Sequence, residues 1–569
     1  MIGLHTKSAA EALRPLNVRY STTEITVLVA NELWAAAEQM REQFQASTWI
    51  TAAPTDTESN DVEPIELAAR FLKFCVSQLP AQREGLAWIE LIRVLFKHLQ
   101  DTFLRGNDVH PATEHLPLPV RKVIINAYYS AQVLLAESVP EEQAAPALFD
   151  CVGAGSAGLF AIFGGQGNVE EYFDETQEVF DTYEPLVRDF AEKMAAALKR
   201  ATSTPQAQTV CPKGLDIMAW LASPDARPDL HYLLSVPISL PIVGFTQLMH
   251  VLVLCKVTNR APGQIAGMFK GVTGHSQGII TSVVFASMTD LDSFYSLSER
   301  ALGMLFAISM YTQLAHPPTT INPAILEDSL ENSEGTPGPM LSVLRLRQND
   351  VERHIEATNR HLPADRQIAL SLINGPRSFV ITGPPQSLYG FNLSLRKLKA
   401  PAGLDQNRVP YSQRKLQFTT RFLPITGPFH SEYLASAPEL AMRDILANGW
   451  TLDAADIHLP AFSGDDGRLL SEEKDLSRKL VDSLCVLPVD WPKATTMEGI
   501  THMIDFGPGG VSGIGGLTNR NKEGTGVRVI LAGALESSNH DLSAKAALFD
   551  TRASSVVFSP NWQRDYAPR

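Results

Sequence analysis

The stretch Gly274-His275-Ser276-Gln277-Gly278 decides the fold and carries the first sign of chemistry. The run at 268–273 precedes it as a short strand, and the apolar run at 279–286 follows it as a buried helix. A serine between two glycines, at a sharp turn from strand to helix, exposes its hydroxyl where the two backbones leave no room for a Cβ. The pattern therefore predicts that Ser276 is a nucleophile and that the backbone N–H of Gln277 faces an oxyanion.

The overall composition is that of a soluble globular protein. The chain has 569 residues, of which 44% are hydrophobic and 19% charged, enough for several domains. Its formal charge of −14 argues against nucleic acid or an anionic membrane as the main partner. The five cysteines lie far apart without a CxxC pair, which is typical of a reduced, cytoplasmic protein without a zinc site.

One apolar stretch, 238–255, is long enough to suggest a membrane span. Pro241, Gln247 and His250 interrupt it, so we expect a helix buried in a large core instead.

The periodicity divides the chain into an α/β protein with added parts. Residues 19–30 alternate as a strand, and helical spacing follows at 65–79, 87–103 and 120–135. We expect a mainly helical N-terminal domain over 1–150 and a hydrolase-like core with a parallel sheet over 151–339 and 426–550. The pattern β-α-β-β-α-β over 340–425 predicts a ferredoxin-like subdomain between the two parts of the core. Residues 551–569 are expected to be a linker.

Three glycine-rich stretches need to be told apart. The stretch 153–158 matches GxGxxG but precedes a strand instead of following one, which argues against a dinucleotide site. The loop 507–510 follows a strand but lacks the GK[ST] of a phosphate-binding loop. Gly164-Gly165-Gln166-Gly167 follows the apolar strand 159–163 and could present backbone N–H groups, or it could be an ordinary tight turn.

A serine nucleophile needs a base, and His430 in Gly427-Pro428-Phe429-His430-Ser431 is the best candidate among fourteen histidines. The acidic residues between Ser276 and His430 fall on predicted surface helices or loops. A backbone carbonyl could orient the imidazole instead, which would make the pair a dyad.

Five motifs in a fixed order resemble one family, the acyl-carrier-protein acyltransferases, and most closely the N-terminal acetyltransferase domain of the fungal type I fatty-acid synthase β chain. They are Gly164-Gly165-Gln166-Gly167, Gly274-His275-Ser276-Gln277-Gly278, Asn374-Gly375-Pro376, Pro428-Phe429-His430-Ser431 and Asp505-Phe506-Gly507-Pro508-Gly509-Gly510. The resemblance covers nearly the whole chain.

The resemblance implies an acyltransferase mechanism. Ser276 would be acylated by acyl-CoA and then discharged to the phosphopantetheine thiol of an acyl carrier protein. His430 would act as base and acid, the N–H groups of Gln166 and Gln277 would form the oxyanion hole, and the carbonyl of Pro492 would orient His430.

The resemblance also implies the setting of this chemistry. No cofactor would be bound permanently, and the flavin and NADPH of the whole synthase are not expected. The chain would be a piece of a longer β chain that assembles with an α subunit and the remaining β domains.

The same resemblance bears on acyl selection. Malonyl-specific relatives carry an arginine twenty-five residues after the nucleophile, where this chain has Ala301, so a neutral acyl group such as acetyl is favoured. Asn374, Ala307 and Ile308 would contact substrate. Ala307 stands where a bulky aromatic residue is usual, and it either enlarges the pocket for a medium-chain starter such as hexanoyl or faces another helix.

Two rival functions remain open on the sequence. One is an α/β-hydrolase esterase or thioesterase with the same serine turn, and the other is a structural synthase segment without turnover of its own. A basic cluster is likewise either a solvated face or a dock for CoA phosphates or an acidic carrier protein; it comprises Arg396, Lys397, Lys399, Arg408, Arg414, Lys415 and Arg421.

Overall fold

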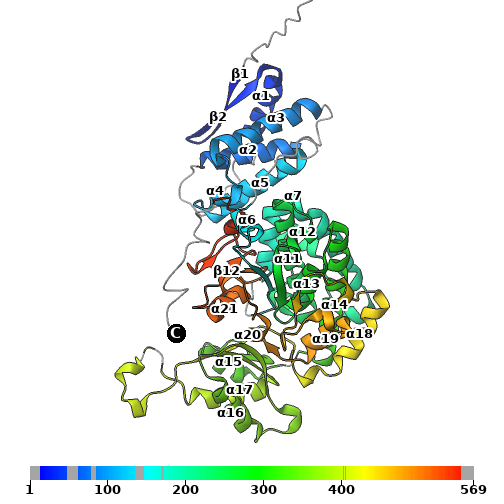
Figure 1. Ribbon diagram of the computed structural model, residues 1–569, viewed down its shortest axis with the longest axis vertical. Helices are drawn as coiled ribbons and strands as arrows, with labels where there is room; N and C mark the ends of the chain where they lie inside the picture. Colours follow the sequence, from blue (N-terminus) through cyan, green and yellow to red (C-terminus); the bar gives the residue numbers. More distant parts are fainter. Residues whose placement is uncertain are drawn as a thin grey trace, which may run out of the picture. The chain divides into compact units, whose positions relative to one another are not determined.

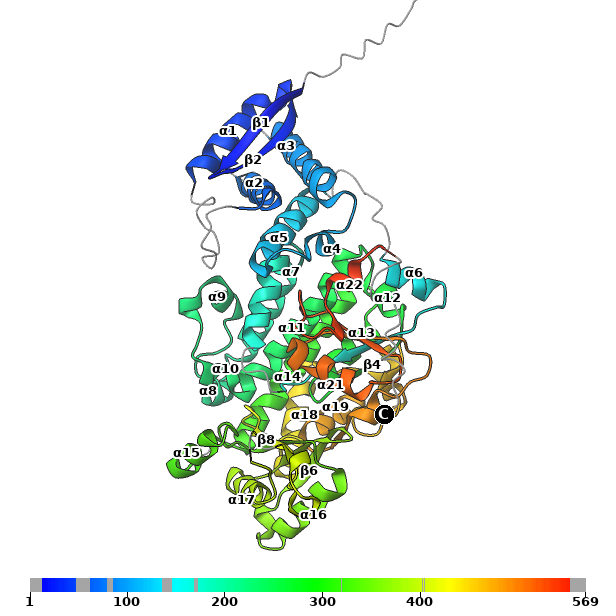
Figure 2. The ribbon, with the colours of Figure 1, turned by 90° about the vertical axis from the view of Figure 1, so that its left-hand side faces the viewer.

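The computed structural model describes residues 13–47, 62–78, 85–135, 146–167, 172–318, 320–401, 403 and 405–552 (Figure 1, Figure 2). They form two compact units. The smaller holds the residues up to 147 together with 180–187 and 549–553, and the larger holds the rest. The C-terminal linker that the sequence predicts at 551–569 lies almost wholly outside the described residues.

The smaller unit begins with an antiparallel hairpin of β1 (Leu13–Tyr20) and β2 (Thr23–Ala30). The expectation of one strand over 19–30 is therefore wrong. Ser21 adopts a left-handed φ of 50°, which reverses the chain so that Arg19 pairs with Glu24. Alternation has the same period on both arms of a hairpin, so it does not reveal the turn.

Helices complete this unit, close to the predicted bounds. They are α1 (Trp34–Ala46), α2 (Pro64–Gln78), α3 (Gly85–His98), α4 (Val109–Thr113) and α5 (Leu118–Leu135). The expected helix 87–103 ends as an α-helix at His98 and continues as a π-helical stretch, η3 (Leu99–Leu104). Phe44 of α1 packs against Phe71 and Phe74 of α2, with ring centroids 5.2 and 5.4 Å apart.

The larger unit is built on a six-stranded sheet in which every pair is parallel, in the order β13-β12-β11-β3-β4-β9. Its strands are β3 (Leu159–Phe163), β4 (Phe269–Gly274), β9 (Ala461–Phe462), β11 (His502–Asp505), β12 (Arg528–Leu531) and β13 (Leu542–Ser543). Because parallel strands end at one edge, the loops after β3, β4 and β11 meet there. Those are the loops that carry three of the five motifs.

A long, mostly apolar helix forms the centre of the helical layer. This is α11 (Val236–Val257), which packs against α13 (Gly278–Ser287) and α14 (Leu291–Ala315) (Figure 1, Figure 2). Among the described helices it alone is long and apolar enough to cross a membrane, and its apolar window is completely buried. The structure thus confirms the prediction that the apolar stretch 238–255, which polar residues interrupt, is a buried core helix.

The larger unit has further helices outside residues 340–425. They are α6 (Ala147–Gly153), α7 (Tyr172–Ala201), α8 (Pro205–Val210), α9 (Ile217–Ala222), α10 (Leu230–Leu234), α12 (Pro262–Ala266), α15 (Pro323–Glu331), α18 (Ala437–Asn448), α19 (Leu476–Cys485), α20 (Trp491–Ala494), α21 (Ile514–Asn521) and α22 (Ala546–Phe549). The middle of α7 and the end of α22 belong to the smaller unit.

The ferredoxin-like pattern is confirmed. Its elements are β5 (Met340–Leu344), α16 (Gln348–Asn359), β6 (Ala369–Gly375), β7 (Ser378–Thr382), α17 (Pro385–Arg396) and β8 (Thr419–Phe422). The sheet has the order β8-β5-β7-β6, and a fifth strand, β10 (Val489–Asp490), pairs in parallel with β6. The sequence did not indicate this strand, because it has only two residues and lies more than a hundred residues further along the chain.

The turn after β4 is as tight as its glycines predict. A Cβ on Gly274 would lie 2.0 Å from the carbonyl carbon of Gly278, and a Cβ on Gly278 would lie 2.4 Å from the carbonyl oxygen of Phe163. These neighbours are backbone atoms of the central sheet and its helix, so they cannot move aside.

We therefore expect Gly278→Ala to lower the free energy of unfolding by about 2 kcal/mol or more, because overpacking a rigid core site is costly. Gly390→Ala is the matched control, since Gly390 lies inside α17 with nothing within 4 Å of its would-be Cβ. That change should be neutral or stabilise by about 0.5–1 kcal/mol. Urea unfolding of both variants measures the difference, and equal effects would contradict the close approach.

Candidate active site

Ser276 and His430 form a hydrogen-bonded pair. The Ser276 Oγ lies 2.8 Å from the His430 Nε2, although 154 positions separate the two residues in the chain. Both have left-handed backbones, with φ of 53° at Ser276 and 58° at His430. Non-glycine residues rarely adopt this conformation, and such strain is concentrated at functional sites. The pair that the sequence predicts is thus brought together.

A backbone carbonyl orients His430, but it is not the predicted one. The Nδ1 of His430 donates to the carbonyl oxygen of Leu487 over 2.8 Å. The assignment to Pro492 needs correction, because the Pro492 carbonyl accepts from Thr496 Oγ1 just after α20. A carbonyl only accepts, so Nδ1 carries the hydrogen and Nε2 is free to take the serine proton.

Burial sets the charge of this imidazole. His430 is buried, and its burial lowers the pKa to about 4 although the Leu487 carbonyl acts in the opposite direction. Among the described residues, no carboxylate hydrogen-bonds to it. The imidazole is therefore neutral at pH 7, which is the form required of a general base.

The loop 164–167 lies directly against the nucleophile. A Cβ on Gly165 would be 3.1 Å from the Ser276 Cβ and 3.1 Å from the His275 carbonyl oxygen, so a side chain there would crowd the serine. Gln166 follows this contact, and Gln277 follows Ser276 on the other side. Both predicted oxyanion residues thus flank the serine.

Gln247 of α11 clamps this loop. It is completely buried, and its Nε2 donates to the carbonyl oxygens of Gly164 and Gly507, both over 2.8 Å. Its Oε1 accepts from Thr281 Oγ1 of α13 over 2.7 Å. One amide therefore joins the loop after β3, the loop after β11 and the helix behind the nucleophile.

The motif at 505–510 supports the loop 164–167 through hydrogen bonds. Asp505 accepts from the backbone N–H of Gly507 over 2.8 Å and of Gly515 over 2.9 Å, and Glu175 accepts from the N–H of Gly509 over 2.7 Å. Burial raises the pKa of each carboxyl to about 7. The Gly507 carbonyl in turn accepts from the N–H of Gly164. This glycine-rich motif is a structural support, in line with its lack of a phosphate-binding signature.

The first turns of α11 hold both predicted oxyanion glutamines. The Gln166 Nε2 donates to the Ser239 Oγ, and the Gln277 Nε2 donates to the Leu240 carbonyl oxygen over 3.2 Å. Nearby, the N–H of Val236 donates to Thr426 Oγ1, four residues before His430. Sequence reasoning missed Ser239, since a serine near a helix start is common, whereas the polar residues interrupting the apolar helix were a usable signal for Gln247.

Asn374 joins the nucleophile turn to the ferredoxin-like subdomain. Its Oδ1 lies 2.8 Å from His275 Nε2, and its carbonyl oxygen accepts from Asn521 Nδ2 over 2.6 Å. A Cβ on Gly375 would lie 2.3 Å from the Asn521 Oδ1, which explains the glycine after Asn374. The amide that was predicted to contact substrate is thus engaged with the residue before Ser276.

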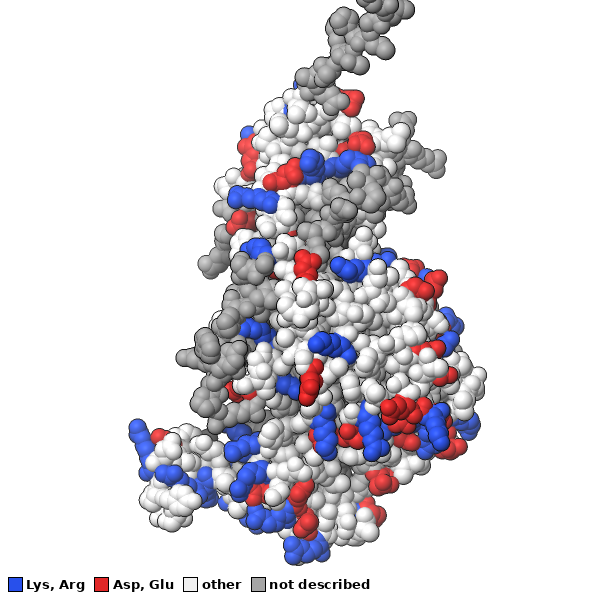
Figure 3. Space-filling view, in the orientation of Figure 1, with Lys and Arg blue, Asp and Glu red and all other residues white. Residues whose placement is uncertain are grey.

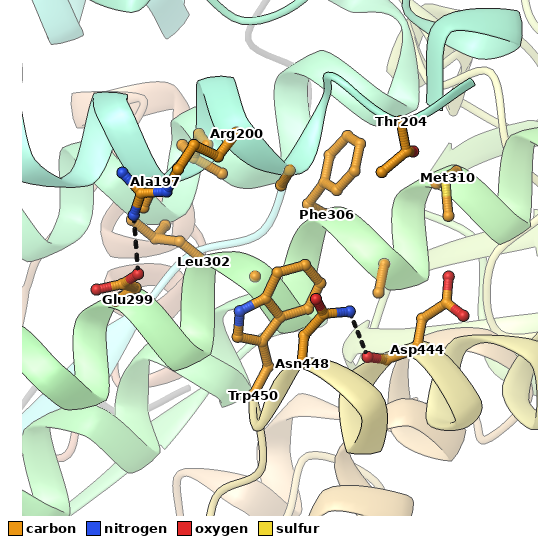
Figure 4. A pocket seen from close by; sticks show the side chains of 14 residues that line it. Ala197, Arg200, Thr204, Glu299, Leu302, Phe306, Met310, Asp444, Asn448 and Trp450 are labelled. Atoms are coloured by element: carbon orange, nitrogen blue, oxygen red, sulfur yellow. Dashed lines mark hydrogen bonds and ion pairs between the residues drawn. The ribbon is translucent and has the colours of Figure 1, made fainter. Parts of the chain in front are cut away.

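The predicted acyl-selecting residues lie on two faces of α14. Ala301 and Ile308 are buried and seven positions apart, so they share a face, whereas Ala307 lies about 100° from Ile308. Ala307 lines a cavity of about 260 Å³ into which Phe306 and Trp450 point (Figure 4). Neither Ser276 nor His430 lines that cavity.

Comparisons with known proteins relate both the N-terminal and the central part of the chain to fatty acid synthase β subunits and ACP transacylases. Residues 12–135 match the family described as the N-terminal domain in fatty acid synthase subunit beta, and residues 161–415 match starter unit:ACP transacylase in aflatoxin biosynthesis. The chain is 41% identical to fatty acid synthase subunit beta of Saccharomyces cerevisiae, over 98% of this chain and 28% of that protein. The corresponding protein of Schizosaccharomyces pombe is 39% identical, over 98% and 26%. This chain belongs to the fatty acid synthase β-subunit family.

The family member described here spans about a quarter of the length of these curated relatives. A solved malonyl CoA-acyl carrier protein transacylase from Clostridium perfringens is similar over 66% of this chain and 93% of its own, with 17% identity and a TM-score of 0.44.

Within the described residues of this β-subunit segment, no group of three or more His, Cys, Asp or Glu side chains is placed to hold a metal.

The low pKa of His430 predicts the pH dependence of serine acylation. The neutral imidazole is the active form, so the single-turnover acylation rate should stay flat from about pH 8 to pH 5 and fall only as the pH approaches 4. The unfolded histidine binds its proton near pH 6.5, so this residue also makes the fold less stable as the pH drops from about 6.5 to 4. Rapid pH-jump acylation measures the first effect, and a midpoint near 6.5 would contradict the burial argument.

The Ser239 contact predicts a positioning effect on the oxyanion loop. Ser239→Ala removes the acceptor for Gln166 and should lower kcat about tenfold, equal to about 1.4 kcal/mol, with little change in KM. Ser239→Thr keeps a hydroxyl and should restore part of the rate. The control is Ser309→Ala, which removes a buried hydroxyl that donates only to the Phe306 carbonyl within α14. Equal losses of kcat in Ser239→Ala and Ser309→Ala would contradict a positioning role.

Proposed function

We propose that this chain is an acyl-CoA:acyl-carrier-protein S-acyltransferase that loads a short neutral starter through an acyl-serine. The observation that carries the proposal is the 2.8 Å contact between Ser276 Oγ and the neutral, carbonyl-oriented His430. The family membership supports it, because one matched region is described as a starter unit:ACP transacylase.

Each half of the reaction uses the same groups. The Ser276 oxygen attacks the thioester carbonyl while His430 Nε2 takes its proton, and the N–H groups of Gln166 and Gln277 stabilise the oxyanion. Collapse breaks the C–S bond, and the CoA thiolate takes the proton from the imidazolium. The carrier's pantetheine thiol then gives its proton to His430, and its sulfur attacks the acyl-serine carbonyl. Collapse breaks the C–O bond to Ser276 and forms the carrier thioester, and the His430 imidazolium returns its proton to the Ser276 oxygen.

A neutral acyl group fits the residues around α14. Ala301 offers no positive charge, and Arg300 lies about 100° around the helix from it. A free carboxylate left unpaired in a buried site is strongly penalised, so malonyl should be excluded. Acetyl is the proposed starter. A longer starter such as hexanoyl would need a pocket beside Ile308, since Ala307 lines a separate cavity.

The setting follows from the family. The chain would work in the cytoplasm as part of a fatty acid synthase β subunit, with an α subunit and further β domains as partners. Acyl-CoA would be the donor substrate and the carrier's phosphopantetheine the acceptor, with no permanently bound cofactor.

An esterase or thioesterase would share the acyl-serine but discharge it to water. A structural synthase segment would form no acyl-serine at all. The fate of the acyl group therefore separates the three functions.

The test is intact-mass measurement after exposure to acetyl-CoA or malonyl-CoA, followed by addition of phosphopantetheine-bearing carrier protein. We expect an acetyl adduct, little malonyl adduct, and loss of the adduct on carrier addition. Ser276→Ala should reduce transfer by a factor on the order of 10⁴–10⁶. Ser282→Ala, which removes a buried hydroxyl on α13, the helix that follows Ser276, should keep the adduct. An adduct that persists in Ser276→Ala, or a preference for malonyl, would refute the assignment.

A further inference from the structure

The ferredoxin-like subdomain has a charge opposite to that of the rest of the chain. Residues 340–425 contain thirteen Lys and Arg and five Asp and Glu, a formal charge of +8, which leaves −22 on all other residues. In Figure 3 the basic side chains gather on the lower part of the visible face, where Figure 1 draws residues near 400 in yellow-green. Such separation creates a local positive field that attracts acidic partners.

A groove with an apolar floor lies in this basic region. It has a volume of about 370 Å³, and its lining comprises Asp350, Arg353, His354 and Ala357 of α16, Arg360 just after this helix, and Leu346, Leu398 and Leu416. Asp350 pairs with Arg353, so Arg360 and the neighbouring Arg414 and Lys415 supply most of the positive charge beside the groove. Leu416 is 48% exposed and Leu398 is 36% exposed. We call it the α16 groove.

The wall that carries the two leucines is an ordered ribbon. The N–H of Leu416 donates to the Leu398 carbonyl over 3.1 Å, and the N–H of Ala400 donates to the Leu416 carbonyl over 2.8 Å. These backbone bonds hold both exposed leucines side by side. Two exposed leucines held side by side give the groove an apolar floor that the apolar face of a partner helix could cover.

Within the described residues between Leu398 and Leu416, Arg408 pairs with Asp405 over 3.5 Å, whereas Arg414 and Lys415 bond to neutral carbonyls. The Arg414 Nε donates to the carbonyl of Val409 over 3.0 Å, and the Lys415 Nζ donates to the carbonyl of Lys397 over 3.5 Å. Both side chains are exposed. Bonds to neutral carbonyls orient the cations but leave their charge available for an incoming anion.

We infer that the α16 groove is a docking surface for the acyl carrier protein, which would bind through an acidic helix with apolar residues on one side. The inference rests on the proposed function. Acyl-CoA and the carrier present the same pantetheine group to Ser276, so the dyad cannot tell them apart, and recognition of the carrier needs protein contacts outside the dyad. The apolar pair fits one face of a helix, and the arginines and lysine fit its acidic flank.

The experiment compares two variants that change the net charge equally. The groove variant reverses the charge of three cations at the α16 groove: Arg353→Glu/Arg414→Glu/Lys415→Glu. The α7 variant reverses the charge of three exposed cations on α7: Arg188→Glu/Lys193→Glu/Lys199→Glu. The probe is the phosphopantetheine-bearing carrier domain of a fungal fatty acid synthase. Three quantities are measured: its binding affinity, acyl transfer to it, and acyl transfer to free pantetheine.

We expect the groove variant to lose roughly tenfold or more in carrier affinity and in kcat/KM for the carrier at about 0.05 M salt. The loss should shrink at about 0.5 M salt, because exposed charges are then screened. Acylation by acetyl-CoA and transfer to pantetheine should stay within about twofold of wild type, as they do not use the groove. The α7 variant should match wild type throughout.

Leu398→Ser/Leu416→Ser tests the apolar floor separately. It should weaken carrier binding without changing the salt dependence, since it removes no charge. Unchanged carrier binding in either groove variant, or an equal loss in the α7 variant, would overturn the inference. Carrier binding requires no turnover. Wild-type protein that binds the carrier but forms no acyl-serine would therefore contradict the proposed function and leave the docking surface intact.

Discussion

The approach of three backbone segments at Ser276 constrains the whole of the larger unit. Gly274 and Gly278 touch across the turn, Gly278 lies against the end of β3, and Gly165 lies against the serine itself. Contacts this short leave no freedom to the two central strands or to α13. The left-handed backbone of Ser276 is retained because the surrounding packing allows no other path.

Helix α11 connects this tight turn to the other loops of the site. Its buried Gln247 joins two loops and α13, and its first turns contact the side chains of Gln166 and Gln277. An apolar helix with a few polar side chains can do this because each buried polar group must find a partner, and Gln247 and Ser239 find partners on the loops after β3 and β11. The polar residues of α11 thus specify loop positions, while its apolar residues supply the packing.

Local pattern predicted much of the fold and the dyad, and the failures have a common cause. The serine turn, the ferredoxin-like order and the buried α11 follow from glycine spacing and periodicity, which act over a few residues. The two-residue β10, the Leu487 carbonyl and the Ser239 contact depend on which segments meet in space. Every residue has a backbone carbonyl, so residue type does not indicate which carbonyl orients His430. The motif containing Pro492 therefore predicted the correct region but not the correct carbonyl. The role of Ala307 stays a prediction with two alternatives for another reason, because a position in a helix does not by itself tell which neighbour it faces.

Strand β10 ties the ferredoxin-like subdomain to the core in a way that limits its exchange. Residues 489–490 pair with β6, and the same short stretch leads from Leu487, which orients His430, to α20. A chimaera that replaces 340–425 with the equivalent part of a relative would set a foreign edge strand against a native β10. Any mismatch in register there would reach the imidazole through a few residues of backbone. Grafting of this subdomain therefore has to include the stretch from Leu487 to Asp490, although it lies outside the subdomain in sequence.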